Sequence, residues 1–133
     1  MLYVDIPHGY SSVFYISAQA TRVKPGISQV HCLSTRVALL KKKFDLDLLY
    51  FWAWDDRTTA GYVEHEILSL LRYWQTSVGH KLREQGLLNK RCNGDTEIFE
   101  RTIFTTPQVL KRQVEYLLPD LPKPIHSYSA FVI

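Results

Sequence analysis

Residues 48–54 read LLYFWAW, an unbroken run of apolar and aromatic side chains. A strand with one wet face alternates polar and apolar residues, whereas a strand covered on both faces has no polar interruption. The run therefore predicts a strand in the middle of the core, with other layers packed against both of its faces.

Two further strands are predicted upstream of this run. Residues 12–18, SVFYISA, are aromatic and β-branched, and Val13, Tyr15 and Ser17 share one face. Residues 21–27, TRVKPGI, follow after a short connection, so the two segments predict a hairpin. Pro25 has no N–H to donate to a neighbour, which means that the second strand must lie at a sheet edge or end there.

Helical periodicity first marks the segment between the hairpin and the central strand. Its apolar positions are Leu33, Val37, Leu40 and Phe44. Ser34 or Thr35 is a candidate N-cap for this short amphipathic helix. Arg36 lies beside its apolar stripe.

A long helix is predicted after the central strand, where Asp55 and Asp56 turn the chain and Thr58 or Thr59 is a candidate N-cap. Its apolar stripe comprises Ala60, Val63, Ile67, Leu71, Trp74 and Val78. At about 100° per residue, Glu64 lies roughly 60° from the middle of that stripe, at its border, whereas His65 and Glu66 face elsewhere.

A final helix is predicted from Thr106 and Pro107, an N-cap followed by a first-turn proline, with a stripe of Leu110, Val114 and Leu117. The helical region covers residues 100–118, and the Pro-containing tail 119–133 is expected to be extended. The order strand, strand, helix, strand, helix predicts an α+β fold: a single domain over residues 1–133 with a small central antiparallel, three-stranded sheet flanked by helices.

Composition fits one globular domain and gives little direct information on function. The chain has 133 residues, of which 46% are hydrophobic and 22% charged, with a net charge of +3. Cys32 and Cys92 lie far apart without a CxxC partner, so neither a disulfide framework nor a cysteine zinc site is indicated. We expect a cytoplasmic protein without a membrane partner, because no leader pattern and no run of roughly 20 apolar residues is present.

Basic residues concentrate between residues 20 and 43, where no acidic residue occurs: Arg22, Lys24, Arg36, Lys41, Lys42 and Lys43. Such a cluster is a candidate phosphate-binding face. The alternative for Lys41–Lys43 is that these three side chains only solvate the outer side of a helix. Serine-nucleophile, P-loop and dinucleotide-binding sites are not indicated, because GxSxG, GxxxxGK[ST] and GxGxxG are absent.

Five motifs follow one another in a recognisable order: VFYI, VKPGIS, Arg36, VEHEILSLL and GDTEIF. This series resembles the GIY-YIG-type nucleases over residues 12–99, and within them the phage- and plasmid-associated branch with a KIG-like second motif. No single motif is specific, and the resemblance rests on their order and spacing. It implies a metal-dependent DNA endonuclease.

The resemblance assigns roles to the two strand motifs. Tyr15 matches the tyrosine that activates or orients the attacking water, although Phe14 could occupy that position in another register and Tyr15 be an ordinary strand tyrosine. Lys24 matches the position that orients water or stabilises phosphate, with an exposed strand lysine as the alternative. Gly26 would allow close backbone approach. Pro25 departs from the family pattern.

It also assigns roles to the helices and the closing motif. Arg36 matches the arginine that contacts phosphate oxygens, which suits a guanidinium. Glu64 matches the ligand of one divalent metal, Mg²⁺ or Mn²⁺, with a solvated helix glutamate as the alternative. Glu97 matches a late glutamate that closes the site. Arg36 lies ten residues after Gly26, a longer gap than the family pattern, which implies an insertion near His31 and Cys32.

The implied reaction is phosphodiester hydrolysis on DNA. In another class of function, a catalytically silent relative binds DNA through the same basic face as an accessory or interaction protein, and a third reading is a toxin or effector domain. Targeting would come from residues 100–133, from a partner protein or from a homodimer. An asparagine that supports the metal site in other members could correspond to Asn89 or Asn93.

Overall fold

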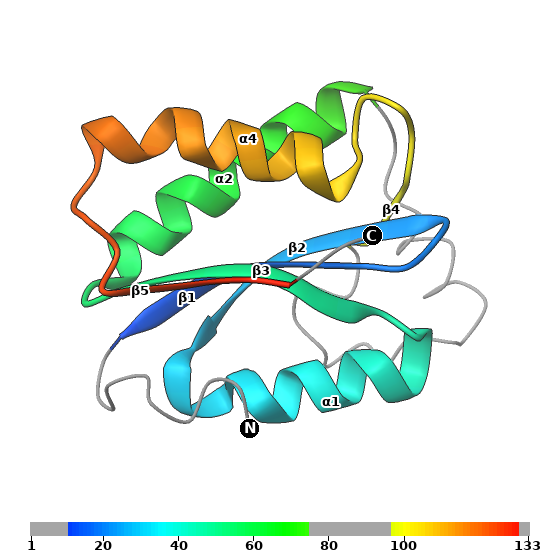
Figure 1. Ribbon diagram of the computed structural model, residues 1–133, viewed down its shortest axis with the longest axis horizontal. Coiled ribbons are helices and arrows are strands. Elements are labelled where there is room, and N and C mark those ends of the chain that lie inside the picture. The colour runs from blue at the N-terminus through cyan, green and yellow to red at the C-terminus, as the bar shows by residue number, and fades with distance from the viewer. Residues whose placement is uncertain (1–10, 75–96, 131–133) are drawn as a thin grey trace.

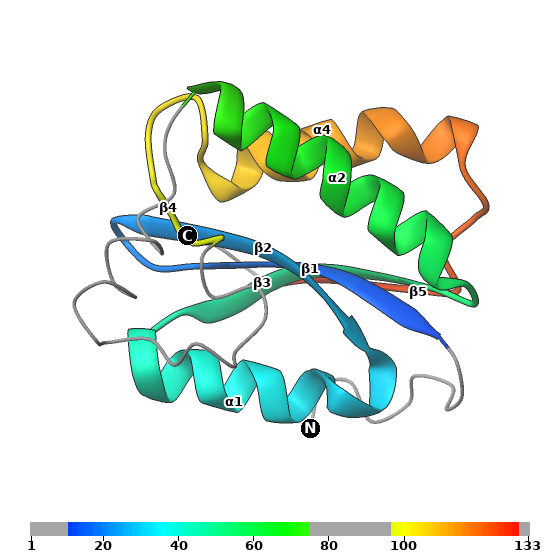
Figure 2. The same cartoon turned by 180° about the vertical axis from the view of Figure 1, so that it is seen from behind.

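The computed structural model describes residues 11–74 and 97–130. Helix α1 (Leu33–Phe44) covers one face of a sheet, and helices α2 (Arg57–Trp74) and α4 (Pro107–Leu117) lie together on the opposite face (Figures 1 and 2). The α+β class predicted from the order of elements is confirmed.

The sheet has the strand order β4-β2-β1-β3-β5, and all its neighbouring pairs are antiparallel. The strands are β1 (Ser12–Ala18), β2 (Arg22–Gln29), β3 (Asp47–Trp54), β4 (Phe99–Glu100) and β5 (His126–Ser129). The expected three strands form the centre, but the sheet has five. Both additional strands are short edge strands, and neither carries the apolar run that marks β1 and β3.

Residues of β1 and β3 alternate between two apolar cores. On the side of α2 and α4, Phe14, Ile16, Trp52 and Trp54 join one buried cluster. On the side of α1, Val13, Tyr15 and Phe51 join another. The two-sided burial predicted for the central strand, and the shared face of Val13 and Tyr15, are confirmed.

The starts of α1 and α2 differ from the sequence expectation. Neither Ser34 nor Thr35 caps α1, because the short 3₁₀ helix η1 (Val30–Cys32) runs directly into it and the Leu33 N–H bonds to the Val30 carbonyl. In α2 the cap is Asp56, whose carboxylate accepts hydrogen bonds from the Thr59 backbone N–H at 2.9 Å and from the Thr59 hydroxyl.

The predicted start of α4 is confirmed. The Thr106 hydroxyl accepts a hydrogen bond from the Val109 N–H at 3.2 Å, and Pro107 is the first helical residue. After the 3₁₀ helix η2 (Leu118–Asp120), the Trp54 indole N–H donates to the Pro122 carbonyl at 2.9 Å and holds the tail against the sheet. The tail then adds β5 to the edge of β3.

Strand β2 is an edge at the position that Pro25 requires. Among the described strands only β4 reaches its outer side, and β4 pairs only with Arg22 and Val23. The expectation that Pro25 cannot lie between two complete ladders is therefore met. No helix in the described segments combines the length and the apolar character needed to cross a bilayer.

Replacing the α2 cap, Asp56→Ala, should lower the free energy of unfolding by about 1 kcal/mol, because the Thr59 N–H loses its acceptor. Urea unfolding followed by circular dichroism would measure the change. The exposed neighbour gives a matched control, Asp55→Ala. Equal effects of the two substitutions would contradict the assignment of Asp56 as the cap.

Candidate functional site

The β1–β2 register places the two strand motifs of the candidate site side by side. Tyr15 pairs with Gly26, and Ser17 pairs with Lys24. Because directly opposed residues share a face, these side chains lie on the α1 side of the sheet. Tyr15 is 0% exposed and Lys24 only 1% exposed. The alternative of an exposed strand lysine at Lys24 is therefore wrong.

Gly26 makes room for the Tyr15 side chain. A Cβ atom at position 26 would lie 2.5 Å from the Tyr15 hydroxyl oxygen and 2.6 Å from Cζ, closer than van der Waals contact permits. The close approach at Gly26 is therefore one between the β2 backbone and the phenol ring. Any side chain at this position would displace Tyr15.

Lys24 is held against Tyr15 in the interior. Its Nζ donates to the Pro25 carbonyl at 3.2 Å and lies 5.8 Å from the centroid of the Tyr15 ring, within the range of a cation–π interaction. Burying an ammonium group is costly unless counter-charge lies nearby. An interaction with the Glu64 carboxylate supplies such counter-charge.

Glu64 is half-buried on α2 and lies where that helix meets β2. Burial is the largest cause that raises its pKa, and the nearby Glu97 carboxylate raises the pKa further. Lys24, Arg72 and a hydrogen bond from the Ile27 backbone N–H act in the opposite direction. Its expected position at the border of the apolar stripe is thus met, and the side chain faces other charged groups.

Glu97 precedes β4 and forms an ion pair with Arg72, with 3.4 Å between Arg72 Nη2 and Glu97 Oε1. Sequence reasoning did not single out Arg72. The only indication in the sequence is that Arg72 is a basic residue about two turns after Glu64 on the same helix.

Two buried hydroxyl groups remain without a partner in the part of the chain that the structure describes, namely those of Tyr15 and Ser17. Buried polar groups are nearly always hydrogen-bonded, so an unsatisfied pair on one strand marks an unusual place. Ser17 was recognised as facing the same way as Tyr15, but it was not proposed as a site residue.

Arg36 lies on α1, which covers the face that carries Tyr15. It is half-buried and sits on the helix surface between Leu33 and Leu40, both of which pack into the core. His31 is exposed just before α1. Asn89 and Asn93 lie outside the described residues.

The basic residues that lie close together in the sequence have different surroundings in the structure. Lys41 Nζ lies 2.6 Å from Asp45 and 3.0 Å from Asp47, and hydrogen bonds to these two carboxylates raise its pKa. Lys42 and Lys43 are exposed on α1. Arg22 is half-buried at the start of β2, opposite Glu100 in the ladder.

The carboxylates suit a divalent cation with an incomplete protein shell. Within the described segments, no group of three or more His, Cys, Asp or Glu residues gathers around one point. Glu64 and Glu97 are nevertheless close enough to repel each other, and a divalent cation would relieve that repulsion. Mg²⁺ favours such hard oxygen donors and keeps several waters.

The structure thus brings Tyr15, Lys24 and Gly26 together and connects them through charge interactions to Glu64 and Glu97. Comparison with known proteins finds no matching protein family, curated protein or solved structure. The functional argument therefore rests on this geometry and on the sequence motifs.

Replacing the crowded glycine, Gly26→Ala, should lower the free energy of unfolding by about 1–3 kcal/mol, because the Tyr15 ring must move. Gly61 in α2 provides the control, since a Cβ there meets nothing within 4 Å. Gly61→Ala should stabilise the protein by about 0.5–1 kcal/mol through helix propensity. Denaturant unfolding would measure both, and a neutral Gly26→Ala would contradict the described packing.

Glu64→Gln should make the metal-free protein more stable at pH 7. Because the folded-state pKa of Glu64 is raised above the ordinary value of 4.5, the folded state binds more protons in the window between these two values. Stability therefore falls as pH rises through the folded pKa. The neutral glutamine avoids that loss, because burial and Glu97 together outweigh the attraction of Lys24 for the Glu64 carboxylate. Thermal unfolding in EDTA should show the two proteins converging below about pH 4. A constant difference at every pH would contradict this account.

Proposed function

We propose that this protein is a metal-dependent DNA endonuclease that hydrolyses phosphodiester bonds, as its resemblance to GIY-YIG-type nucleases implies. The observation that supports this most is the buried Lys24 ammonium, which lies against the Tyr15 ring and interacts with the Glu64 carboxylate. Tyr15 and Lys24 are in contact on adjacent strands, and Lys24 acts electrostatically on Glu64 of α2.

Glu64, with Glu97 beside it, would hold the cation, either Mg²⁺ or Mn²⁺. When bound, such an ion neutralises charge on the phosphate and on the leaving oxygen. Arg72 pairs with Glu97 and thereby fixes the second carboxylate.

Lys24, Arg36 and Tyr15 account for the remaining tasks. Lys24 and Arg36 supply positive charge to the phosphate oxygens, whose negative charge grows during hydrolysis. The Tyr15 hydroxyl has no partner among the described residues, so it has hydrogen-bonding capacity left for orienting a water molecule. DNA would approach over the exposed Lys42 and Lys43, and over Arg22 at the start of β2.

The complete burial of Tyr15 and Lys24 supports a second function. Tyr15 is 0% and Lys24 1% exposed, so neither side chain reaches the surface, and Pro25 departs from the family pattern between them. A protein that binds DNA through its basic surface without cutting it would have such a closed site. Its partner would be DNA together with a second copy or another protein.

Nicking of supercoiled plasmid with Mg²⁺ or Mn²⁺ would separate these two functions. The wild type should nick, EDTA should abolish nicking, and Glu64→Gln and Arg36→Ala should each lower the rate by at least about 100-fold, the size of one lost transition-state contact. Glu66→Gln is the matched control, because Glu66 lies on the same helix but lines the groove between α2 and α4.

Salt-sensitive DNA binding without nicking would favour the binding protein. Absence of both binding and nicking would contradict the two proposals together. A second readout is independent of activity: Mg²⁺ should raise the melting temperature of the wild type more than that of Glu64→Gln.

A further inference from the structure

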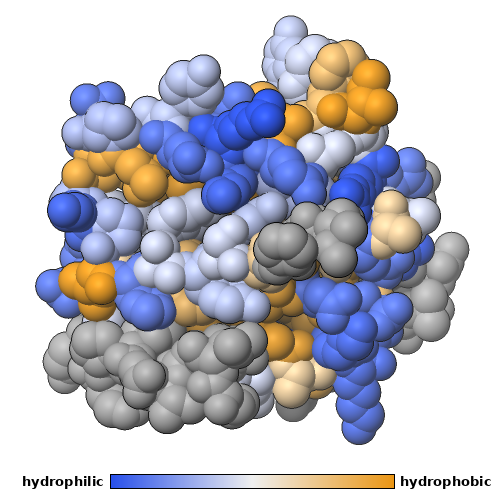
Figure 3. All heavy atoms as spheres, viewed as in Figure 1, coloured by the Kyte–Doolittle hydropathy of each residue, from blue (hydrophilic) through white to orange (hydrophobic). Residues whose placement is uncertain are grey.

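Aromatic side chains project into solvent where α2 ends and the loop after β4 passes beside it. Trp74 and Phe104 stack with their ring centroids 5.4 Å apart at an interplanar angle of 15°, and Tyr73 meets Trp74 edge-on at 5.4 Å. We call these three residues the aromatic ledge. They are 53%, 57% and 81% exposed, for Trp74, Phe104 and Tyr73 respectively. The space-filling view shows an orange hydrophobic patch near the end of α2 and the loop after β4, beside paler atoms (Figure 3).

The loop that carries Phe104 is ordered by hydrogen bonds of its own. Thr102 and Thr105 share a hydrogen bond between their hydroxyls at 2.8 Å, the Thr102 N–H donates to the Thr105 hydroxyl at 2.9 Å, and the Phe104 N–H donates to the Thr102 hydroxyl at 3.2 Å. Thr105 itself is fully buried. The fold therefore orders this turn while keeping Phe104, and the 80% exposed Ile103, out of the core. Ordered exposed apolar groups of this kind mark binding sites.

The ledge adjoins both positive charge and the candidate site. Arg72 directly precedes Tyr73, and its side chain is 59% exposed. It forms an ion pair with Glu97 and lowers the pKa of Glu64. Arg101 begins the loop on the other side and is anchored by its bond to the Gln19 carbonyl at 2.9 Å. Stackable rings flanked by guanidinium groups are the combination that binds single-stranded nucleic acid.

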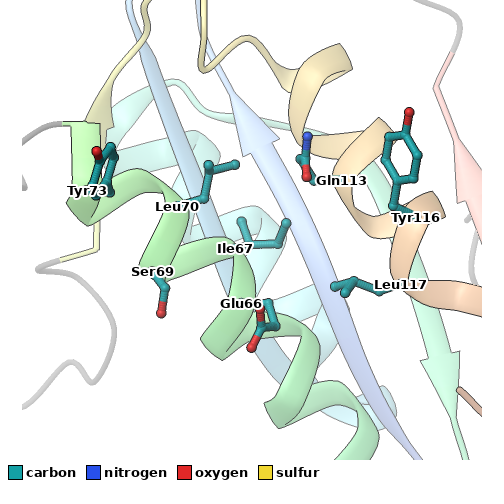
Figure 4. Close-up of a pocket in the computed structure, with 8 residues that line it drawn as sticks. All are labelled: Glu66, Ile67, Ser69, Leu70, Tyr73, Gln113, Tyr116 and Leu117. Atoms are coloured by element: carbon teal, nitrogen blue, oxygen red, sulfur yellow. The ribbon is translucent and has the colours of Figure 1, made fainter. Parts of the chain in front are cut away.

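The groove between α2 and α4 offers a contrast. It has a volume of about 380 Å³, and its lining includes Ile67, Leu70, Tyr116 and the acidic Glu66, with Tyr73 of the ledge at its rim (Figure 4). None of its eight lining residues is basic. A polyanion is therefore suited to the ledge and not to this groove.

We propose that the aromatic ledge stacks an unpaired base of a DNA strand next to the Glu64–Glu97 carboxylates. The inference rests on the proposed function and narrows its substrate to DNA with single-stranded or splayed nucleotides. The guanidinium of Arg72, which is paired with Glu97 through Nη2, would turn its remaining N–H groups to the phosphate beside the stacked base. The next phosphate along the strand would lie toward Glu64. Fully paired duplex hides the base faces and cannot use the ledge.

Tryptophan fluorescence tests this directly, because Trp52 and Trp54 are 5% and 1% exposed and Trp74 alone of the three tryptophans is open to solvent. Titration with oligo-dT in EDTA should quench the wild-type emission, and Trp74→Phe should abolish the quenching while anisotropy of labelled DNA still reports binding. Phe104→Ala should weaken oligo-dT binding by at least about fivefold and duplex binding by less than about twofold.

Tyr116→Ala provides the matched control, since it removes a comparably exposed (77%) aromatic side chain from α4. It should leave oligo-dT affinity unchanged.

Equal weakening by Phe104→Ala and Tyr116→Ala, or unquenched Trp74 at saturation, would overturn the proposal. So would sedimentation showing that Phe104→Ala breaks a dimer without changing DNA affinity, because the ledge would then bind a second copy. Unchanged oligo-dT affinity in Phe104→Ala, with plasmid nicking by the wild type intact, would remove only the ledge. Absence of all DNA binding by the wild type would remove the proposed function.

Discussion

Strand β1 sets the conditions for the rest of the structure, because it is covered on both faces and paired along both edges. All seven of its residues are buried, with helices on each side and β2 and β3 as neighbours. No polar group on this strand can rely on bulk water. Apolar layers on both faces follow from that constraint, as do the unusual positions of the Tyr15 and Ser17 hydroxyls, which the described residues leave unsatisfied.

The candidate site grows from the same constraint. Lys24 is drawn into the interior beside β1, and its ammonium group is compensated by the Tyr15 ring on one side and by the Glu64 carboxylate of the opposite helical layer. Glu64 is in turn destabilised as an anion by burial and by Glu97. The charges therefore depend on one another across two layers and connect α2 with the hairpin electrostatically as well as by packing.

Much of the fold could be predicted from the sequence, because long periodic or unbroken apolar segments carry their own signal. The run LLYFWAW, the stripe of α4 and the edge imposed by Pro25 are examples. Strands β4 and β5 were not foreseen as part of the sheet, since two to four residues without a pattern become strands only when a neighbouring edge recruits them. The cap of α2 was missed by two or three residues because Asp56 competes with Thr58 and Thr59 for the same role.

Site prediction divides in a similar way. The sequence motifs identified Tyr15, Lys24 and Glu64 as candidate site residues. Their placement in one site could be inferred only from the resemblance. Sequence could not reveal that Lys24 is buried, because a lysine in a strand is usually exposed, or that Asp45 and Asp47 fold back onto Lys41. Arg72 and the aromatic ledge depend on contacts between residues that are 25 to 30 positions apart, 72 with 97 and 74 with 104.

The hydrogen bond from the Ile27 N–H to Glu64 has a consequence for self-association. The outer side of β2 beyond Val23 is a row of backbone groups that no other described strand pairs, and such a row is a template for adding a strand from another molecule. Pro25 has no donor there, and the donor of Ile27 is already taken by a helix carboxylate. A foreign strand would meet an interrupted ladder and a negative charge. Among the described residues, Glu64 thus makes this edge a poor template for joining two copies strand to strand.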